Sequence, residues 1–202
     1  GKERWNFRID GPIYGTPAVA EGKTFLVGCD SLMHVIDVAK GKEERSVELG
    51  GQTGASAAVV GERLYVGTMK NEVLAIDWKK GASAWTFKPA RRAQAFFSSP
   101  AVTDKLVVIG SRDNRLYALD RKDGKEVWSF PTGGRVDSSP VVVGTRVVVG
   151  SLDASLYVLD LATGRQVQKV ALDDQVTGSP VVVGGRVLIG THKGTLYCLG
   201  AK

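Results

Sequence analysis

The sequence predicts an all-β protein, a β-propeller of about five four-stranded antiparallel blades. Two observations lead to this prediction: one residue pattern recurs five times, and each copy consists of short apolar runs divided by turns. The glycines that end the second run of each copy lie 39, 43, 40 and 40 residues apart. Repeats of this length are typical of solenoids and propellers. These glycines are Gly28, Gly67, Gly110, Gly150 and Gly190.

The fourth copy shows the strands of one repeat most clearly. Residues 139–143, 146–150, 155–160 and 165–170 are Val-rich or alternating runs, bounded by Gly, Asp and Thr. Such runs with connections of two to five residues indicate antiparallel hairpins. No stretch of helical length keeps an apolar period of 3.6 residues. Each repeat is therefore predicted to be a meander of four strands.

A propeller explains the apolar runs better than a sandwich does. Val141–Val143 and Val147–Val149 are apolar at every position instead of alternating. Continuous apolar strands suit an element that is covered on both faces. A blade packed between two other blades has that environment, and the radial arrangement protects the strand edges.

The two ends of the chain predict closure of the ring. Residues 4–7 match an outermost strand, and the last copy stops after its third strand, which ends at Leu199. We expect Trp5–Ile9 to pair with Thr195–Leu199, which places strands from both ends in one blade; an arc of a larger ring is the alternative. The expected organisation is one domain, residues 1–202, with repeats at approximately 4–44, 45–84, 85–127, 128–167 and 168–200.

Two segments in the third repeat carry a family resemblance. Gly110–Tyr117 (GSRDNRLY) and Ala118–Trp128 (ALDRKDGKEVW) resemble the tryptophan-docking repeat of the pyrroloquinoline-quinone (PQQ) repeat β-propellers, and the resemblance extends over all five repeats. It implies that a Trp of each repeat docks against the backbone of a neighbouring repeat. The residues in this slot are Trp5, Arg45, Trp85, Trp128 and Gln168.

The resemblance implies a periplasmic or otherwise extracytoplasmic protein, with a cytoplasmic location as the alternative. The family contains quinoprotein dehydrogenases as well as non-catalytic members. The dehydrogenases have an adjacent Cys pair and a calcium site, whereas this chain has only Cys29 and Cys198 and no cluster of calcium-type carboxylates. We therefore expect no bound cofactor and no metal ligands.

No catalytic signature is found in the sequence. It contains no G-x-S-x-G, H-E-x-x-H, P-loop or dinucleotide-binding glycine pattern, and its only histidines are His34 and His192. We expect a non-catalytic scaffold or binding module that presents inter-blade loops to a protein or a small anionic ligand. The alternatives are a fragment of a PQQ-type quinoprotein oxidoreductase and an engineered propeller without a partner.

The third inter-blade segment departs from the other copies. Residues 89–97 are about three residues longer than their counterparts and combine two arginines with two phenylalanines. Loops on a rigid scaffold commonly bind partners, and Arg with aromatic residues is typical of binding hot spots. We predict an aromatic anchor surrounded by cations that select an acidic group; packing of the two phenylalanines at the channel mouth is the alternative. The candidate residues are Arg91, Arg92, Phe96 and Phe97, supported by Arg112, Arg115 and Arg135.

Recurring Asp residues end the third run of four copies, each followed four residues later by Gly. An Asp that accepts hydrogen bonds from its own turn, with Gly at positive φ, explains this spacing better than metal binding does. The pairs are Asp37 and Gly41, Asp77 and Gly81, Asp120 and Gly124, and Asp160 and Gly164.

Charge gives a weaker indication of partners. The net charge is +6, and a basic residue begins every second strand of the repeat. We expect these cations to form a solvated ring on one face, with an anionic partner or a membrane surface as the alternative. The modest excess argues against nucleic acid, no apolar stretch is long enough to span a membrane, and a monomer is expected. The series is Lys23, Arg63, Lys105, Arg146 and Arg186.

Overall fold

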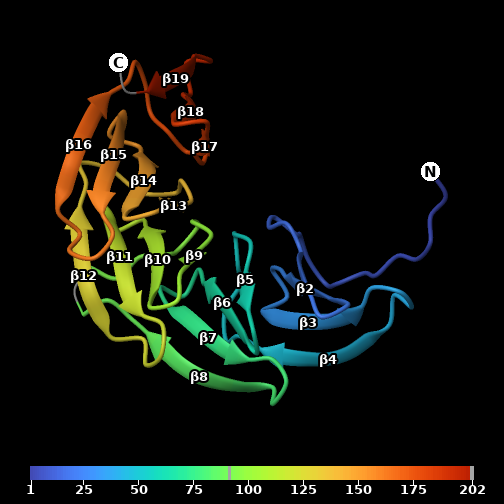
Figure 1. Cartoon of the computed structure of the whole chain (residues 1–202). Coiled ribbons are helices and arrows are strands. Elements are labelled where there is room, and N and C mark those ends of the chain that lie inside the picture. The colour runs from blue at the N-terminus through green and yellow to red at the C-terminus, as the bar shows by residue number, and fades with distance from the viewer. Residues whose placement is uncertain (91, 201–202) are drawn as a thin grey trace. The chain divides into compact units, whose positions relative to one another are not determined.

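The fold is built only from strands and turns. The structure, a computed structural model, describes residues 1–90 and 92–200. In these residues it has nineteen strands and no helix, arranged as five antiparallel sheets (Figure 1). No helix that could cross a membrane exists in the described part of the chain. The chain divides into two compact units, Gly1–Phe96 and Phe97–Lys202.

The first unit contains two four-stranded meanders. Both contribute to one apolar core, in which Phe25 and Met33 of the first sheet lie with Leu64 and Ile76 of the second. The strands of the first sheet are β1 (Ala18–Ala20), β2 (Lys23–Val27), β3 (Leu32–Asp37) and β4 (Glu43–Glu48). Those of the second sheet are β5 (Ala58–Val60), β6 (Arg63–Gly67), β7 (Val73–Asp77) and β8 (Ala82–Phe87).

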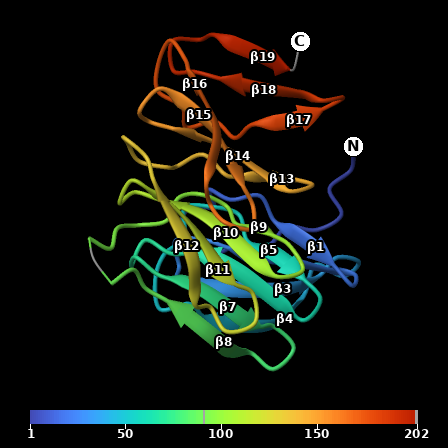
Figure 2. The same cartoon turned by 60° about the vertical axis from the view of Figure 1, so that its left-hand side comes forward.

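The second unit contains two further four-stranded meanders and one sheet of three strands. Figure 2 shows the three strands of the last sheet running side by side. The third sheet consists of β9 (Ala101–Val102), β10 (Leu106–Ser111), β11 (Arg115–Asp120) and β12 (Glu126–Pro131). The fourth consists of β13 (Val141–Val143), β14 (Arg146–Ser151), β15 (Ser155–Asp160) and β16 (Gln166–Ala171). The fifth consists of β17 (Val181–Val183), β18 (Arg186–Gly190) and β19 (Leu196–Gly200).

Burial within a blade follows the sequence pattern. Strand β10 is buried at all six positions, and β14 at every position after Arg146. The outermost strands β4 and β16 are exposed along most of their length. The prediction that the apolar runs are covered on both faces is therefore confirmed for β10 and β14, but it is wrong for Val141–Val143, which is only partly buried.

The recurring Asp residues serve their own turns, as predicted. The carboxylate of Asp77 accepts a hydrogen bond from the N–H of Lys80 at 2.9 Å, and the carbonyl of Asp77 accepts one from Gly81. Gly81 has φ +70°, a conformation that costs glycine little. The same contacts recur at Asp37, Asp120 and Asp160.

A ladder of hydrogen bonds joins the first residues of successive repeats. The N–H of Ser99 donates to Oγ of Ser139 at 2.9 Å, and the N–H of Ser139 donates to Oγ of Ser179 at 3.0 Å. Thr16 and Ser56 form the same contact in the first unit, at 2.8 Å. At Ser56, Ser139 and Ser179, the small polar residue that opens the repeat therefore accepts a hydrogen bond from the backbone of the preceding repeat.

Tryptophan docking takes place as the family resemblance implies. Nε1 of Trp128 donates to the carbonyl of Leu161 at 2.9 Å, and Nε1 of Trp5 donates to Val38 at 2.8 Å. Each ring also lies against the Gly of the same turn: a Cβ on Gly164 would be 2.5 Å from the Trp128 ring. In a third slot Arg45 replaces Trp, and its Nη1 donates to the carbonyl of Lys80 at 3.3 Å.

The expected outermost strand around Trp5 is not formed. Residues 1–17 belong to no strand, and the fifth sheet has three strands. A strand assignment requires a ladder of backbone hydrogen bonds to a partner strand, and this segment has none. Closure of the ring by Trp5–Ile9 stays a prediction.

One position in the basic series differs from the expected register. Strand β10 begins at Leu106, which lies opposite Asp120, and Lys105 precedes the strand. In the first sheet, by contrast, Lys23 lies opposite Asp37 and forms an ion pair with it. In the fourth sheet Arg146 lies opposite Asp160 and does the same. Lys105 lies five residues before Gly110, whereas Arg63, Arg146 and Arg186 each lie four residues before the corresponding glycine.

Candidate binding site

The predicted site lies on the segment that joins β8 to β9. Arg91 is outside the described residues. Arg92 is exposed and has φ +51°. Phe96 is completely buried, and its N–H donates to the carbonyl of Thr68 at 3.1 Å. The Phe96 side chain is therefore not available at the surface as the predicted aromatic anchor.

Phe97, the first residue of the second unit, is half-buried and lies beneath an arginine. The guanidinium carbon of Arg112, in the turn between β10 and β11, is 3.6 Å from the centre of the Phe97 ring. Cations over an aromatic face are attracted by the ring quadrupole. The structure thus brings together two of the predicted residues.

Asp137 holds this arginine in place. Nε and Nη2 of Arg112 donate to the two carboxylate oxygens of Asp137, at 2.9 and 2.8 Å. Bidentate pairs of this kind are geometrically specific and stronger than neutral hydrogen bonds. The contact raises the pKa of Arg112 above its ordinary value, which keeps the guanidinium charged. Arg112 therefore links two successive inter-blade segments, those that carry Phe97 and Asp137.

The other predicted cations have separate surroundings. Nη1 of Arg115, at the start of β11, donates to Oγ of Ser129 on β12 at 3.0 Å. Arg135 lies on the β12–β13 connection, where its carbonyl accepts a hydrogen bond from the N–H of Leu152. Its side chain is exposed and has no ion pair among the residues that the structure describes. Arg115 donates to a neutral hydroxyl and is half-buried, so Arg135 is the exposed one of the predicted cations in the second unit.

Sequence reasoning missed Asp137. An available signal was its place in the repeat, because it aligns with Phe97, one residue after a buried position that is Phe96 or Val136. The backbone N–H groups of these buried residues make equivalent hydrogen bonds, to Thr68 and Ser111. Residues at the next position are therefore expected to lie together at the surface.

A second pattern in the second unit was also missed. Tyr117 and Tyr157 each donate from the hydroxyl to an Asp four residues earlier, Asp113 and Asp153, at 2.5 Å. Burial, followed by the hydrogen bond to Asp153, raises the pKa of Tyr157 above its ordinary value. In each Asp the other carboxylate oxygen is buried without a hydrogen-bond partner in the described structure. These hydrogen bonds join the β10–β11 turn, which carries Arg112, to β11, and the equivalent β14–β15 turn to β15.

This surface carries an arginine held over an aromatic ring, the exposed Arg135 and backbone turns. Within residues 1–90 and 92–200, no three His, Cys, Asp or Glu side chains gather as a metal-binding group. Cys29 is half-buried, Cys198 is exposed, and both are free thiols.

Comparison with known proteins defines the family. The sequence model of the family described as outer membrane protein assembly factor BamB, a PQQ-repeat family, matches residues 34–202. The chain belongs to this family. The expected PQQ-repeat resemblance is therefore confirmed.

A solved structure supports the same fold. The crystal structure of BamB from Moraxella catarrhalis matches with a TM-score of 0.85 and 21% sequence identity, covering 97% of this chain and 63% of that one. This chain thus spans less than two thirds of the BamB chain, and at this identity the match establishes the β-propeller fold alone. A comparison with curated protein sequences finds no match.

Proposed function

We propose that the chain is a non-catalytic scaffold that binds an acidic segment of another protein through the inter-blade connections of its second unit. The observation that carries this proposal is the stack of Phe97, Arg112 and Asp137 beside the inter-blade segment of Arg135. Arg91 and Arg92, which precede Phe97 in the sequence, stay predicted binding residues.

The stack is suited to binding because its geometry is fixed before a partner arrives. The two hydrogen bonds from Arg112 to Asp137 hold the guanidinium over the Phe97 ring. Ordering a rotamer-rich side chain at an interface costs about 0.5–1.5 kcal/mol, and this cost is already met in the free protein. The pair of Arg112 with Asp137 is neutral, so the exposed Arg135 would provide the net positive charge that attracts an acidic partner.

The family name supports the class of partner. Relatives described as outer membrane protein assembly factors act, by that description, in assembling outer membrane proteins. We therefore propose an extracytoplasmic location and a partner in outer membrane protein assembly. The absence of a recognisable catalytic pattern in the sequence agrees with a non-enzymatic role.

Site-specific photo-crosslinking tests this proposal. A benzophenone amino acid is placed at Arg135 in one sample and, as a matched control, at Arg165, an exposed arginine on the turn before β16. After irradiation with a bacterial envelope fraction, the variant labelled at 135 should crosslink a protein of outer membrane assembly, identified by mass spectrometry, and the variant labelled at 165 should not. Equal crosslinking from both positions, or none from position 135, would reject the proposed surface.

Charge reversal provides the second test. Arg135→Glu should weaken capture of the crosslinked partner several-fold, because an interface cation becomes a repelling anion, whereas Arg165→Glu should leave it unchanged. Both variants should unfold at the same temperature as the original chain, since neither side chain has an ion pair to lose among the described residues.

A further inference from the structure

The third blade lacks a cation that the strand register supplies elsewhere. Leu106 faces Asp120 across β10 and β11. At the same place in the first sheet, Lys23 faces Asp37 and binds its carboxylate at 3.0 Å. In the fourth and second sheets, arginines occupy this register position, Arg146 opposite Asp160 at 2.9 Å and Arg63 opposite Asp77.

A second charge is missing from the same corner of the blade. Val127 on β12 corresponds to Glu44 on β4, because Glu126 and Glu43 hold the same place in the two ladders. In the first sheet Glu44 is the second carboxylate that binds Lys23. The third blade thus replaces a Lys and a Glu with Leu106 and Val127, but it keeps the aspartate.

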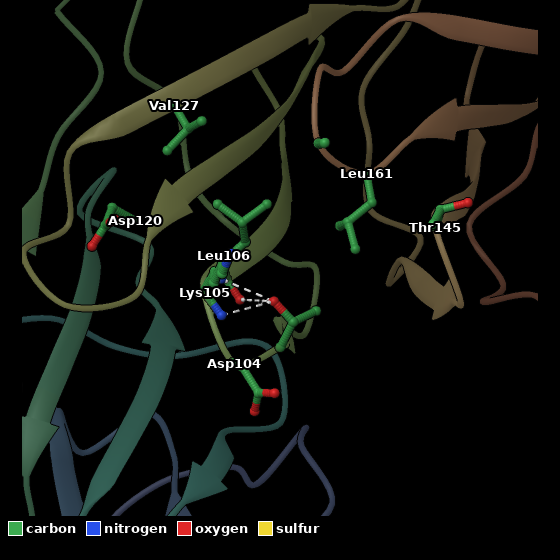
Figure 3. A pocket seen from close by; sticks show the side chains of 9 residues that line it. Asp104, Lys105, Leu106, Asp120, Val127, Thr145 and Leu161 are labelled. Atoms are coloured by element: carbon green, nitrogen blue, oxygen red, sulfur yellow. Dashed lines mark hydrogen bonds between the residues drawn. The ribbon is translucent and has the colours of Figure 1, made fainter.

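The substitutions produce an apolar groove between the third and fourth blades, within the second unit. Its volume is about 540 Å³, which lies in the range of ligand-binding pockets. Figure 3 shows Leu106 and Val127 of one blade facing Leu161 and Thr145 of the next. The lining residues are Thr103, Asp104, Lys105, Leu106, Asp120, Val127, Thr145, Leu161 and Ala162.

The corresponding junction in the first unit is covered by a larger side chain. Trp78 follows Asp77 as Leu161 follows Asp160, and its ring packs edge-on against Phe25 with 5.0 Å between the ring centres. Its Nε1 also donates to the carbonyl of Gly61 at 2.9 Å. A leucine in place of this tryptophan leaves the apolar surface of the third blade open.

Asp120 lines this groove and has an uncompensated carboxylate. Its Oδ1 accepts hydrogen bonds from the N–H groups of Lys122 and Asp123, and the carboxylate forms no ion pair among the described residues. Lys125 binds Asp123, and Nη1 of Arg121 donates to the carbonyl of Thr103. Half-buried Asp120 therefore combines a charge without a counter-ion and an adjoining apolar wall.

The rim adds one charge of each sign. Asp104 and Lys105 are both exposed and sit next to each other in the turn between β9 and β10, where the hydroxyl of Thr103 fixes the backbone of Lys105 and Leu106 (Figure 3). They cancel in net charge. The groove as a whole is therefore singly negative, in a chain whose net charge is +6.

We propose that this groove binds a peptide segment of a partner protein in which a Lys or Arg stands next to a bulky aliphatic residue. The cation would occupy the place of the missing Lys or Arg opposite Asp120, and the aliphatic side chain would cover Leu106, Val127 and Leu161. A charge-assisted hydrogen bond to a half-buried carboxylate and burial of apolar surface together provide affinity and select for both groups. This surface is separate from the Phe97–Arg112 stack and does not depend on the proposed function.

Methyl NMR of the full chain tests the proposal with defined probes. The probe is the capped peptide Gly-Leu-Lys-Leu-Gly, and the matched control replaces its Lys with Gln. The lysine peptide should shift the methyl signals of Leu106, Val127 and Leu161, and the glutamine peptide should bind about tenfold more weakly because it cannot form the ion pair. Equal affinity of the two peptides, or shifts confined to other methyl groups, would overturn the proposal.

Variants of the protein separate binding from folding. Leu106→Arg restores the residue type of the other repeats, so it should keep the fold and abolish peptide binding. Asp120→Asn should weaken binding about tenfold, whereas Asp160→Asn changes an equivalent turn already paired with Arg146 and should not. Lys105→Ala removes a positive charge that repels the lysine of the peptide, so it should strengthen binding several-fold. Binding that survives Leu106→Arg would overturn the proposal.

A second copy of the chain is the other possible occupant of the groove. Methyl shifts of the same residues that depend on protein concentration in the absence of peptide, and that vanish in Leu106→Arg, would assign the groove to a second copy of the chain and overturn the peptide proposal. Concentration-independent spectra before addition of peptide are the expected result.

Discussion

Nη1 of Arg45 donates a hydrogen bond to the carbonyl of Lys80 at 3.3 Å, in the slot where Trp128 donates to Leu161 at 2.9 Å. The guanidinium also lies over Gly81, since a Cβ added there would be 2.6 Å from Nη1. Arginine thus reproduces both contacts of the docking tryptophan, with a donor to the same carbonyl position and a flat group against the same glycine. It covers the turn less completely, because Arg45 is exposed whereas Trp128 is buried.

Restoring the tryptophan should therefore stabilise the first unit. Arg45→Trp is expected to raise the free energy of unfolding by about 1 kcal/mol through added apolar burial, and Arg45→Ala to lower it by a similar amount through loss of the hydrogen bond. Urea unfolding monitored by circular dichroism measures both. A tryptophan variant less stable than the alanine variant would contradict the view that this slot accepts either residue.

The glycine under each docked ring should be more sensitive than other turn glycines. Gly164 has φ +70°, and an added Cβ would be 2.5 Å from the Trp128 ring. Gly164→Ala should cost more than the roughly 1–2 kcal/mol expected from the left-handed backbone alone, because the indole must also move. Thermal or urea unfolding measures the loss.

Gly144 provides the matched control for this substitution. It has φ +56° but no atom within 4 Å of an added Cβ. Gly144→Ala should therefore show the backbone cost alone, about 1–2 kcal/mol. Equal losses for the two variants would mean that the ring contact at Gly164 contributes nothing.

The serine ladder predicts a further difference between two repeats. Ser139→Ala leaves the N–H of Ser99 without its acceptor, and such a loss at a partly buried site costs about 1–3 kcal/mol. Ser179→Ala removes the same type of contact to Ser139, but Ser179 is exposed and water can replace its hydroxyl. Its cost should be smaller. Free energies of unfolding in urea measure both losses. A larger loss for Ser179→Ala than for Ser139→Ala would contradict the prediction.

The repeat pattern predicted the strands and turns well because the same local rules act in every copy. Alternation of apolar runs with Asp and Gly turns fixes hairpins through short-range contacts, and β13 to β16 lie close to the predicted runs. The position of the docking tryptophan was also predictable, because it recurs at the same place in the repeat. Ring closure is different, since it depends on pairing between residues at opposite ends of the chain, and the segment around Trp5 forms no strand.

The candidate site was less predictable because it depends on departures from the repeat. Phe96 and Phe97 are adjacent in a segment of unusual composition, yet one is in the core and the other lies under Arg112. Alignment with Val136 and Asp137 would have separated them. The groove at Leu106 depends on the pairing of Leu106 with Asp120, which appears only when the strand register is known.

Acid should destabilise the protein through the Asp turns. The hydroxyl and N–H of Thr163, together with Arg146, lower the pKa of Asp160 below its ordinary value of 3.8, and the N–H of Lys80 has the same effect on Asp77. A carboxylate whose pKa is depressed on folding stabilises the native state above the pKa of the unfolded chain, and this stabilisation is lost as the pH falls through the native value. Stability should therefore decline from about pH 3.8 downward.

Asp160→Asn isolates one of these groups. At neutral pH the variant should melt below the original chain, because the amide cannot replace the carboxylate toward Arg146. As the pH falls below 3.8 the difference between the two melting temperatures should shrink, since protonation removes the same charge from Asp160. Melting curves of both proteins between neutral and strongly acidic pH measure this difference. A difference that stays constant or widens in acid would show that the turn is stabilised by the shape of the side chain and not by its charge.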